Sequence, residues 1–250
     1  QGIGGSDVAA ILGISPFRTA RDLYDDKLNI ASAVDDAGNW VALEMGHLLE
    51  PLVAQIFTKK TGLEVFQIKK MFQHPQYPFM LADVDYFVRL PNGKIALLEI
   101  KTTNYNAKDH WWKDDEEYVP IYYETQGRHY MAVMDIDEIF YCCLYGNNED
   151  EVIIRHLYRD REYEQEMIYL EREFWHDHIL TRIPPPYTED GSRRKMMKVC
   201  AAVWVLPTKP SRPFSSTMTC PPPCCDTSAY RSKNSRWKRG SKRWTQKCSV

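Results

Sequence analysis

Two periodicities alternate along residues 1–190, and each predicts its own kind of element. Apolar residues between Leu43 and Phe57 recur at helical spacing, whereas from Leu63 onward the pattern changes to that of strands. We therefore predict helices over residues 6–12, 19–28, 43–61, 120–134 and 160–180. We predict strands over residues 63–72, 80–90, 94–103, 138–145 and 151–158, with a loop or loose helix at 105–118.

Capping and turn residues mark the ends of these elements. Ser6 and Thr19 are of the type that caps helix N-termini, and Gly13 and Gly62 are placed to end helices. The order helix, three strands, helix, two strands, helix predicts an α/β (α+β) fold, with a mixed central sheet flanked by helices.

Polar residues share one face of two predicted strands. Glu99 and Lys101 are two positions apart and point the same way, while Leu98 and Ile100 point to the other face. Asp85 lies on the preceding strand. Two carboxylates beside an ammonium suit metal-assisted cleavage of a phosphodiester. The pattern therefore predicts a catalytic site at these three charged residues.

The turn between the two strands decides whether Asp85 can join this site. If Asn92-Gly93 formed a two-residue loop, Asp85 would lie opposite Ile100, on the wrong face. If Pro91-Asn92-Gly93 forms a three-residue loop, Asp85 lies opposite Glu99. We favour the three-residue loop because it brings all three polar groups together.

Charge is distributed unevenly along the chain. Residues 191–250 hold 14 Lys and Arg residues and one acid, which leaves residues 1–190 with a net charge of −15. This acidity argues against a general nucleic-acid coat protein but not against a nuclease, since metal ions supply local positive charge. Residues 191–250 also hold five of the seven cysteines, without CxxC spacing. We expect a folded domain over 1–190 and a basic, Cys- and Pro-containing tail that is disordered or non-native.

Five blocks of sequence stand in a fixed order within residues 2–190. They are Ile3–Gly13 with Ser15-Pro16, Gly46–Pro51, the Asp85 strand, Glu99–Thr102, and Gln126 with His129–Met131. Together they resemble the lambda-exonuclease-like family of YqaJ-type viral recombinases, a branch of the PD-(D/E)XK nucleases. The family usually reads Asn, a hydrophobic residue, Asp and Gly where this chain has Asp83-Val84-Asp85-Tyr86. Asp83 is therefore an alternative to Asp85 as the metal ligand, and spacing and register favour Asp85.

The resemblance implies a restriction-endonuclease-like fold and a set of site residues. Mg2+, for which Mn2+ can substitute, is expected at oxygen ligands, as hard cations prefer: Glu50, Asp85, Glu99 and the carbonyl of Ile100. Lys101 would orient or deprotonate the attacking water and offset transition-state charge, with Gln126 and Tyr130 lining the site. The family contacts a DNA phosphate at its first block, here Gly5 and Ser6, where backbone N–H groups open a helix.

The resemblance also implies an activity. We expect double-stranded DNA to be degraded from its 5′ end in phage-type recombination, with a single-strand annealing protein as partner and a possible homo-oligomer. Alternatives are an endonuclease, a RecB-like nuclease with an iron–sulfur cluster, or an inactive DNA-end-binding protein. Only Cys142-Cys143 lie within the nuclease core, which argues against a cluster.

The sequence also predicts the cellular location of the protein. No run approaches the roughly 18 apolar residues of a membrane span, and there is no secretory signal. We expect a cytoplasmic protein without membrane contact, encoded by a phage or prophage in a bacterial host. The chain begins at Gln1, immediately before the first block, and we expect native residues to precede it.

Overall fold

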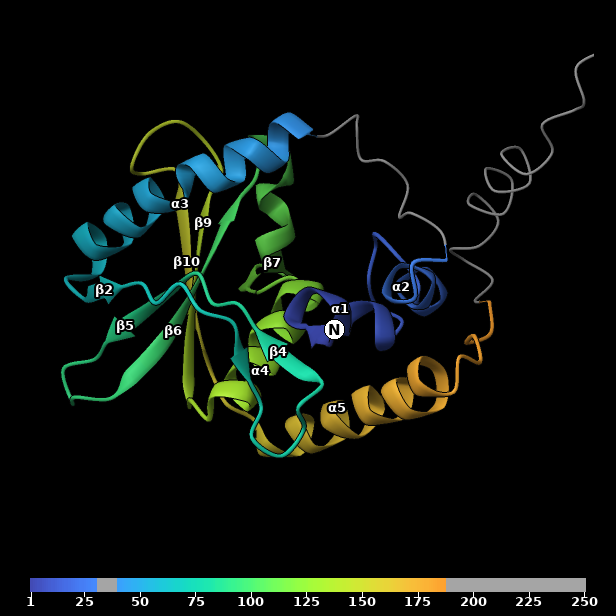
Figure 1. Ribbon diagram of the computed structural model, residues 1–250. Helices are drawn as coiled ribbons and strands as arrows, with labels where there is room; N and C mark the ends of the chain where they lie inside the picture. Colours follow the sequence, from blue (N-terminus) through green and yellow to red (C-terminus); the bar gives the residue numbers. More distant parts are fainter. Residues whose placement is uncertain (31–39, 188–250) are drawn as a thin grey trace, which may run out of the picture. The chain divides into compact units, whose positions relative to one another are not determined.

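The structure is a computed structural model that describes residues 1–30 and 40–187. The predictions for residues 191–250 lie outside the described residues. A mixed five-stranded sheet of order β10-β9-β6-β5-β2 forms its centre (Figure 1). Its strands are β2 (Glu64–Phe66), β5 (Tyr86–Arg89), β6 (Ile95–Thr102), β9 (Glu138–Leu144) and β10 (Val152–Tyr158). β6 and β9 run parallel, and the other neighbours are antiparallel.

Helices cover both faces of this sheet, because apolar side chains line both. α3 (Trp40–Thr61) packs on the face that carries Leu98 and Ile100. α4 (Ile121–Met134) connects β6 to β9 and lies on the face that carries Leu97 and Ile139. Two further helices, α1 (Gly5–Ile11) and α5 (Arg161–Glu173), contact α4. This arrangement confirms the mixed sheet flanked by helices.

A second, three-stranded sheet corrects two predicted strands. It has the order β1-β4-β3, with β1 (Ile3–Gly4), β3 (Phe72–Gln73) and β4 (Met80–Ala82). The single strand predicted over 80–90 is wrong, because β4 pairs in this sheet and β5 in the central one. The strand predicted over 63–72 is likewise limited to β2 and the start of β3. The chain bends between β4 and β5, at the two candidate aspartates.

The loop between β5 and β6 has three residues, 91–93. The Gly93 N–H donates to the Leu90 carbonyl oxygen at 2.9 Å, and Gly93 has φ +82°, in the region that favours glycine. The pairing of β5 with β6 that follows, extended by one residue, sets Asp85 opposite Glu99. The register that we favoured from the sequence is confirmed.

The predicted N-cap is correct for the second helix and wrong for the first. Thr19 caps α2 (Ala20–Lys27) through its side chain, as predicted. Ser6 is not an N-cap, because α1 begins one residue before it. Gly4 stands at the N-cap position, and its N–H donates to the Asp7 carboxylate at 2.8 Å. The Asp7 carboxylate, inside the first turn, therefore caps this helix in place of Ser6.

The remaining elements lie around the central sheet. Residues 105–118 form a 3-10 helix, η1 (Tyr105–Trp111), and a short ribbon of β7 (Trp112–Lys113) with β8 (Glu116–Glu117). α5 continues into a π-helical segment, η2 (Phe174–Leu180). Within the described ranges, no helix is both long and apolar enough to cross a membrane.

Candidate active site

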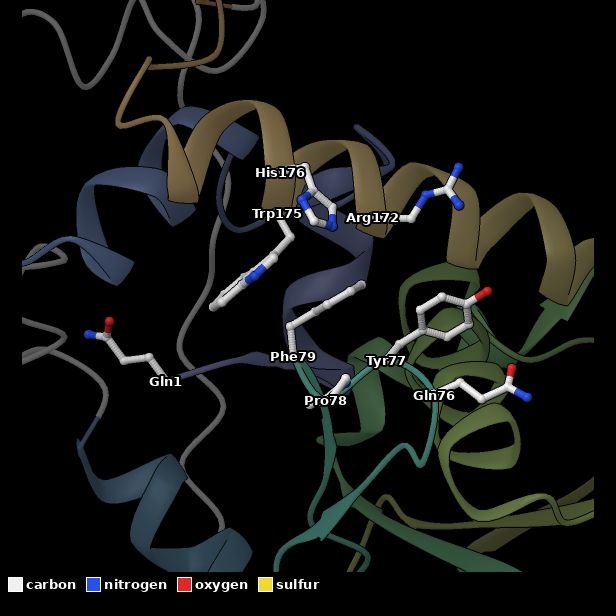
Figure 2. Close-up of a pocket in the computed structure, with 8 residues that line it drawn as sticks. All are labelled: Gln1, Gln76, Tyr77, Pro78, Phe79, Arg172, Trp175 and His176. Atoms are coloured by element: carbon white, nitrogen blue, oxygen red, sulfur yellow. The ribbon is translucent and has the colours of Figure 1, made fainter.

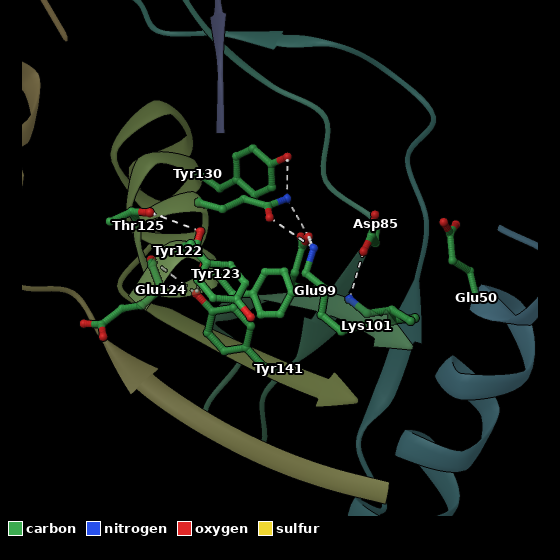
Figure 3. A network of polar contacts seen from close by, with 12 residues as sticks. Glu50, Asp85, Glu99, Lys101, Tyr122, Tyr123, Glu124, Thr125, Tyr130 and Tyr141 are labelled. Atoms are coloured by element: carbon green, nitrogen blue, oxygen red, sulfur yellow. Dashed lines mark hydrogen bonds and ion pairs between the residues drawn. The ribbon is translucent and has the colours of Figure 1, made fainter. Parts of the chain in front are cut away.

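A hydrogen-bonded cluster joins β6 to α4 (Figure 3). Lys101 Nζ lies 2.6 Å from Glu99 Oε1 and 3.0 Å from Gln126 Oε1. Gln126 Nε2 donates to Glu99 Oε1 at 2.6 Å and lies 3.2 Å from the Tyr130 hydroxyl. The Lys101 ammonium also lies 4.7 Å from the centre of the Tyr123 ring. Four predicted site residues thus meet in one network.

Asp85 joins this cluster from the bend before β5. Its Oδ2 accepts the Ile100 N–H at 2.8 Å, beyond the point where β5 stops pairing with β6. The N–H and C=O of one strand residue point to the same side, so the Ile100 carbonyl also points toward Asp85. Asp83 is exposed. The geometry therefore favours Asp85 over Asp83 as a partner of Glu99.

Burial and like charge make this site electrostatically unusual. Glu99 is only 2% exposed, and burial raises its pKa against the opposing effect of the Lys101 ammonium. Burial, followed by the charge of Glu99, raises the pKa of Asp85 well above its usual value. Burial lowers the pKa of Lys101, but the two carboxylates outweigh this effect and the pKa is raised. A buried carboxylate, Glu99, and a half-buried one, Asp85, therefore lie close to a single ammonium.

One oxygen of this site has no partner. Glu99 Oε2 is buried and makes no hydrogen bond in the described part of the chain. A buried carboxylate oxygen without a partner is costly, and a bound cation would relieve both that cost and the repulsion from Asp85. Asp85 and Glu99 thus fit a divalent metal ion.

Glu50 lies on α3, across from Asp85 (Figure 3). Its Oε1 is 3.2 Å from His47 Nδ1, and its charge contributes to the raised pKa values of Asp85 and Glu99. Within residues 1–30 and 40–187, no three His, Cys, Asp or Glu side chains form a compact metal cluster. Glu50 is therefore close to the two carboxylates but not assembled with them.

The N-terminal motif packs against the same cluster. Gly5 is buried, and a Cβ added there would lie 2.5 Å from Tyr130 Cε1 and 2.9 Å from Gln126 Cγ. Ser6 is exposed on the first turn of α1. The predicted phosphate contacts, Gly5 and Ser6, are thus held next to the residues that line the site.

Buried ion pairs fix this N-terminal segment. Asp7 is buried and pairs with Arg18 and, at 2.7 Å, with Lys27 Nζ. Arg18 also donates to the Ser6 carbonyl at 3.4 Å. Because these cations come from the loop before α2 and from its last turn, they tie the first motif to the second helix.

Tyr123 is a site residue that the sequence analysis missed. It lies three residues before Gln126 and seven before Tyr130, so all three share one face of α4. That helical spacing is a signal that could have identified Tyr123. Burial raises its pKa, with Lys101 opposing, and its ring supports the ammonium from one side.

His129, from the fifth block, has a structural position instead. It is fully buried, with Nδ1 2.9 Å from Glu171 Oε1 of α5 and Nε2 2.9 Å from the Leu81 carbonyl of β4. Burial lowers the pKa of His129, but Glu171 outweighs this effect and raises it. Since both ring nitrogens face acceptors, an imidazolium satisfies this position and ties three elements together.

A cavity of about 560 Å3 lies elsewhere in the molecule (Figure 2). Its wall combines the turn before β4, which contributes Tyr77 and Phe79, with Trp175 and His176 of η2. None of the predicted site residues lines it. The candidate active site is therefore the polar cluster on β6 and α4, not this cavity.

Solved structures share the fold. An alkaline exonuclease, LHK-Exo from Laribacter hongkongensis, matches with a TM-score of 0.57 and 18% identity over 79% of this chain and 94% of that one. A phage related exonuclease from Haemophilus somnus 129PT matches with a TM-score of 0.55 and 14% identity, over 73% and 97% of the two chains. At these identities the likeness shows the fold, which is the restriction-endonuclease-like one that we expected.

Sequence comparison identifies the family. The uncharacterized protein YqaJ of Bacillus subtilis (strain 168) is 33% identical over 201 residues, which cover 79% of this chain. The match spans 60% of that relative's length. The model of the YqaJ-like viral recombinase domain matches residues 1–137, which include Asp85, Glu99, Lys101, Gln126 and Tyr130. The chain therefore belongs to the YqaJ-like viral recombinase domain family.

Proposed function

We propose that this protein is a metal-dependent DNA exonuclease. The observation that carries the proposal is the convergence of Asp85, Glu99 and Lys101, with the buried Glu99 Oε2 left without a hydrogen bond. LHK-Exo and the Haemophilus protein, both named as exonucleases and both of the same fold, support it. LHK-Exo also forms a complex with dAMP, a deoxynucleoside monophosphate.

Mg2+, with Mn2+ as a substitute, is the metal that we propose. Asp85, Glu99, the Ile100 carbonyl and Glu50 would hold one or two ions, since all four offer oxygen ligands. When bound, the metal polarises the scissile phosphate and lowers the pKa of a water molecule. Metal charge would also compensate for the acidity of the domain when DNA approaches.

The residues of this chain then have separate tasks. Lys101, held by Glu99 and Gln126, would orient the attacking water and offset the negative charge that develops on the phosphate. Because the effect of burial is outweighed by the two carboxylates, which raise its pKa, the side chain is an ammonium, which favours this role over deprotonation of the water. Gln126 would orient both Glu99 and Lys101 through its two hydrogen bonds. Tyr130 would fix the Gln126 amide from the far side. Hydrolysis would leave a 5′-phosphate on the released nucleotide.

The finer features of the activity belong to the same proposal. We propose double-stranded DNA as the substrate, with degradation from the 5′ end. The product strand would enter phage-type recombination through a single-strand annealing protein. Gly5 and Ser6, on the first turn of α1 beside Tyr130, would contact a DNA phosphate, and homo-oligomers would be compatible with this activity.

A digestion assay with the full chain tests the proposal. Linear duplex DNA labelled at either end and a covalently closed circle are incubated with Mg2+ or Mn2+. We expect loss of the linear DNA with the circle spared, and the label released first gives the direction. Cleavage of the circle would indicate an endonuclease. No cleavage with either metal would favour an inactive DNA-end-binding protein.

Two lysines of β6 and its preceding loop provide a matched pair of variants. Lys101→Ala is expected to reduce the rate at least 100-fold, the magnitude typical for loss of one charge-stabilising donor. Lys94→Ala, an exposed lysine paired with Asp137 at 3.4 Å, should cut at the wild-type rate. Full activity of folded Lys101→Ala protein would contradict the assignment of this site.

A further inference from the structure

A groove of about 420 Å3 runs between α3 and the strands β2 and β5. The residues that line it include Pro51, Ala54, Gln55, Lys59, Val65 and Tyr86. None of the predicted site residues lines it, so nothing in the reaction described above uses it.

Each wall of the groove includes a chain neighbour of a predicted metal ligand. Tyr86 directly follows Asp85, and Pro51 directly follows Glu50. Tyr86 pairs with Leu98 and packs on the cluster that contains Val53, so its side chain lies on the sheet face that α3, the helix of Glu50, covers. A strand of DNA that passes between Asp85 and Glu50 would therefore meet Tyr86 along α3.

The far end of the groove carries a cation. Lys59 lies nine residues after Glu50 on α3, or about 13 Å along the helix axis. Its Nζ is 2.5 Å from Glu149 Oε2, and the two side chains are 68% and 51% exposed. Exposed pairs of this kind contribute little to stability, so Lys59 can exchange Glu149 for another anion.

The groove has an apolar wall and hydrogen-bond donors, the two features that a nucleotide site needs. Ala54 and Val65, with the ring of Tyr86, form an apolar wall that suits a base or a sugar. Gln55 and Lys59, one turn apart on α3, provide donors that suit a phosphate. An acidic peptide would lack the planar group for the apolar wall.

We propose that this groove binds the nucleotide next to the scissile phosphate in the DNA strand being cut, with the Tyr86 ring against its base and Lys59 Nζ against a phosphate. The proposal rests on the proposed function, and it makes Tyr86 and Lys59 substrate-positioning residues. It also explains why a half-buried tyrosine lines a groove directly after a catalytic carboxylate.

Binding of DNA that carries 2-aminopurine at or next to its terminal nucleotide tests the groove. The Lys101→Ala background keeps the DNA intact, and fluorescence quenching reports stacking on Tyr86. Tyr86→Leu keeps apolar volume but removes the ring, and it should weaken binding about 5- to 100-fold and reduce the quenching. Tyr86→Phe should retain both, which separates stacking from loss of folding.

Neighbouring lysines of α3 supply the second comparison. Lys59→Gln should weaken binding and lower the slope of log affinity against log salt by about one. Lys60→Gln should change neither, because Lys60 does not line the groove and pairs with Asp150 at 3.0 Å.

The outcomes separate this inference from the proposed function. Wild-type binding and quenching in folded Tyr86→Leu, or equal effects of the two lysine variants, would overturn the proposal that the groove binds a nucleotide. The exonuclease proposal would be unaffected, because the Lys101 assay tests it separately. Failure of the protein to bind any DNA end would overturn both.

Discussion

Gly5→Ala examines how the N-terminal motif supports the site. The new methyl group would lie 2.5 Å from Tyr130 Cε1 and 2.9 Å from Gln126 Cγ, so α1 and α4 must separate or the two side chains must move by about 1 Å. Overpacking of this kind costs about 1–3 kcal/mol, and the better helix propensity of alanine returns up to about 1 kcal/mol. We expect a net loss of about 1–2 kcal/mol in the free energy of unfolding.

The effect on cleavage should exceed the effect on stability. Gln126 lies 2.6 Å from Glu99 and 3.0 Å from Lys101, and a displacement of 1 Å in a supporting side chain can reduce a rate about 100-fold. Gly4→Ala is the matched control, because its Cβ would meet nothing closer than Asp7 Oδ2 at 3.7 Å and its φ of −93° suits alanine.

The assay combines thermal unfolding with digestion of linear duplex DNA, at a temperature where both variants are folded. The destabilisation of Gly5→Ala corresponds to a melting temperature lower by about 2–8 °C. If Gly5→Ala and Gly4→Ala cut and melt alike, the packing of α1 on α4 does not position Gln126, and the reasoning is refuted.

Three further predictions concern single side chains. Glu50→Gln should raise the Mg2+ concentration needed for half-maximal cleavage several-fold, while Glu44→Gln, at an exposed position of the same helix, should not. The same Mg2+ requirement in both variants would show that Glu50 is not a metal ligand. Gln126→Ala should reduce kcat about 10- to 100-fold with unchanged unfolding, and wild-type kcat would show that its two hydrogen bonds are dispensable. The pKa of His129 is raised above its unfolded value of about 6.5, so its contribution to stability is fully present below that pH and is lost as the pH rises through the folded pKa. Between pH 6 and pH 9, the free energy of unfolding measured in urea should therefore fall less for His129→Gln than for wild type. An equal fall in both proteins would mean that the buried ring is neutral.

Much of the site could be predicted because it depends on local periods. The two-residue spacing of Glu99 and Lys101 fixes their common face, and the three-residue loop at 91–93 fixes the register that sets Asp85 opposite Glu99. The four-residue spacing of Gln126 and Tyr130 likewise places both on one face of α4. These relations need only the geometry of a strand, a turn and a helix.

Other features could not be predicted, because they depend on contacts between distant segments. The break between β4 and β5 arises since one segment pairs with β1 and the next with β6, in two different sheets. The cap of α1 comes from Asp7, which Arg18 and Lys27 hold in place, so the local preference of Ser6 loses to tertiary ion pairs.

The sequence by itself determined the family, the mixed sheet and the identity of the polar cluster. Ordered motifs and short periods involve residues that are close together in the chain, so they can be recognised without the fold. Only the tertiary structure decided that Tyr123 supports Lys101, that Glu50 stands apart from the two carboxylates, and that Tyr86 lines a groove. Each of these depends on how α3 and α4 pack on opposite faces of β6, and packing is set by side chains far apart in the chain.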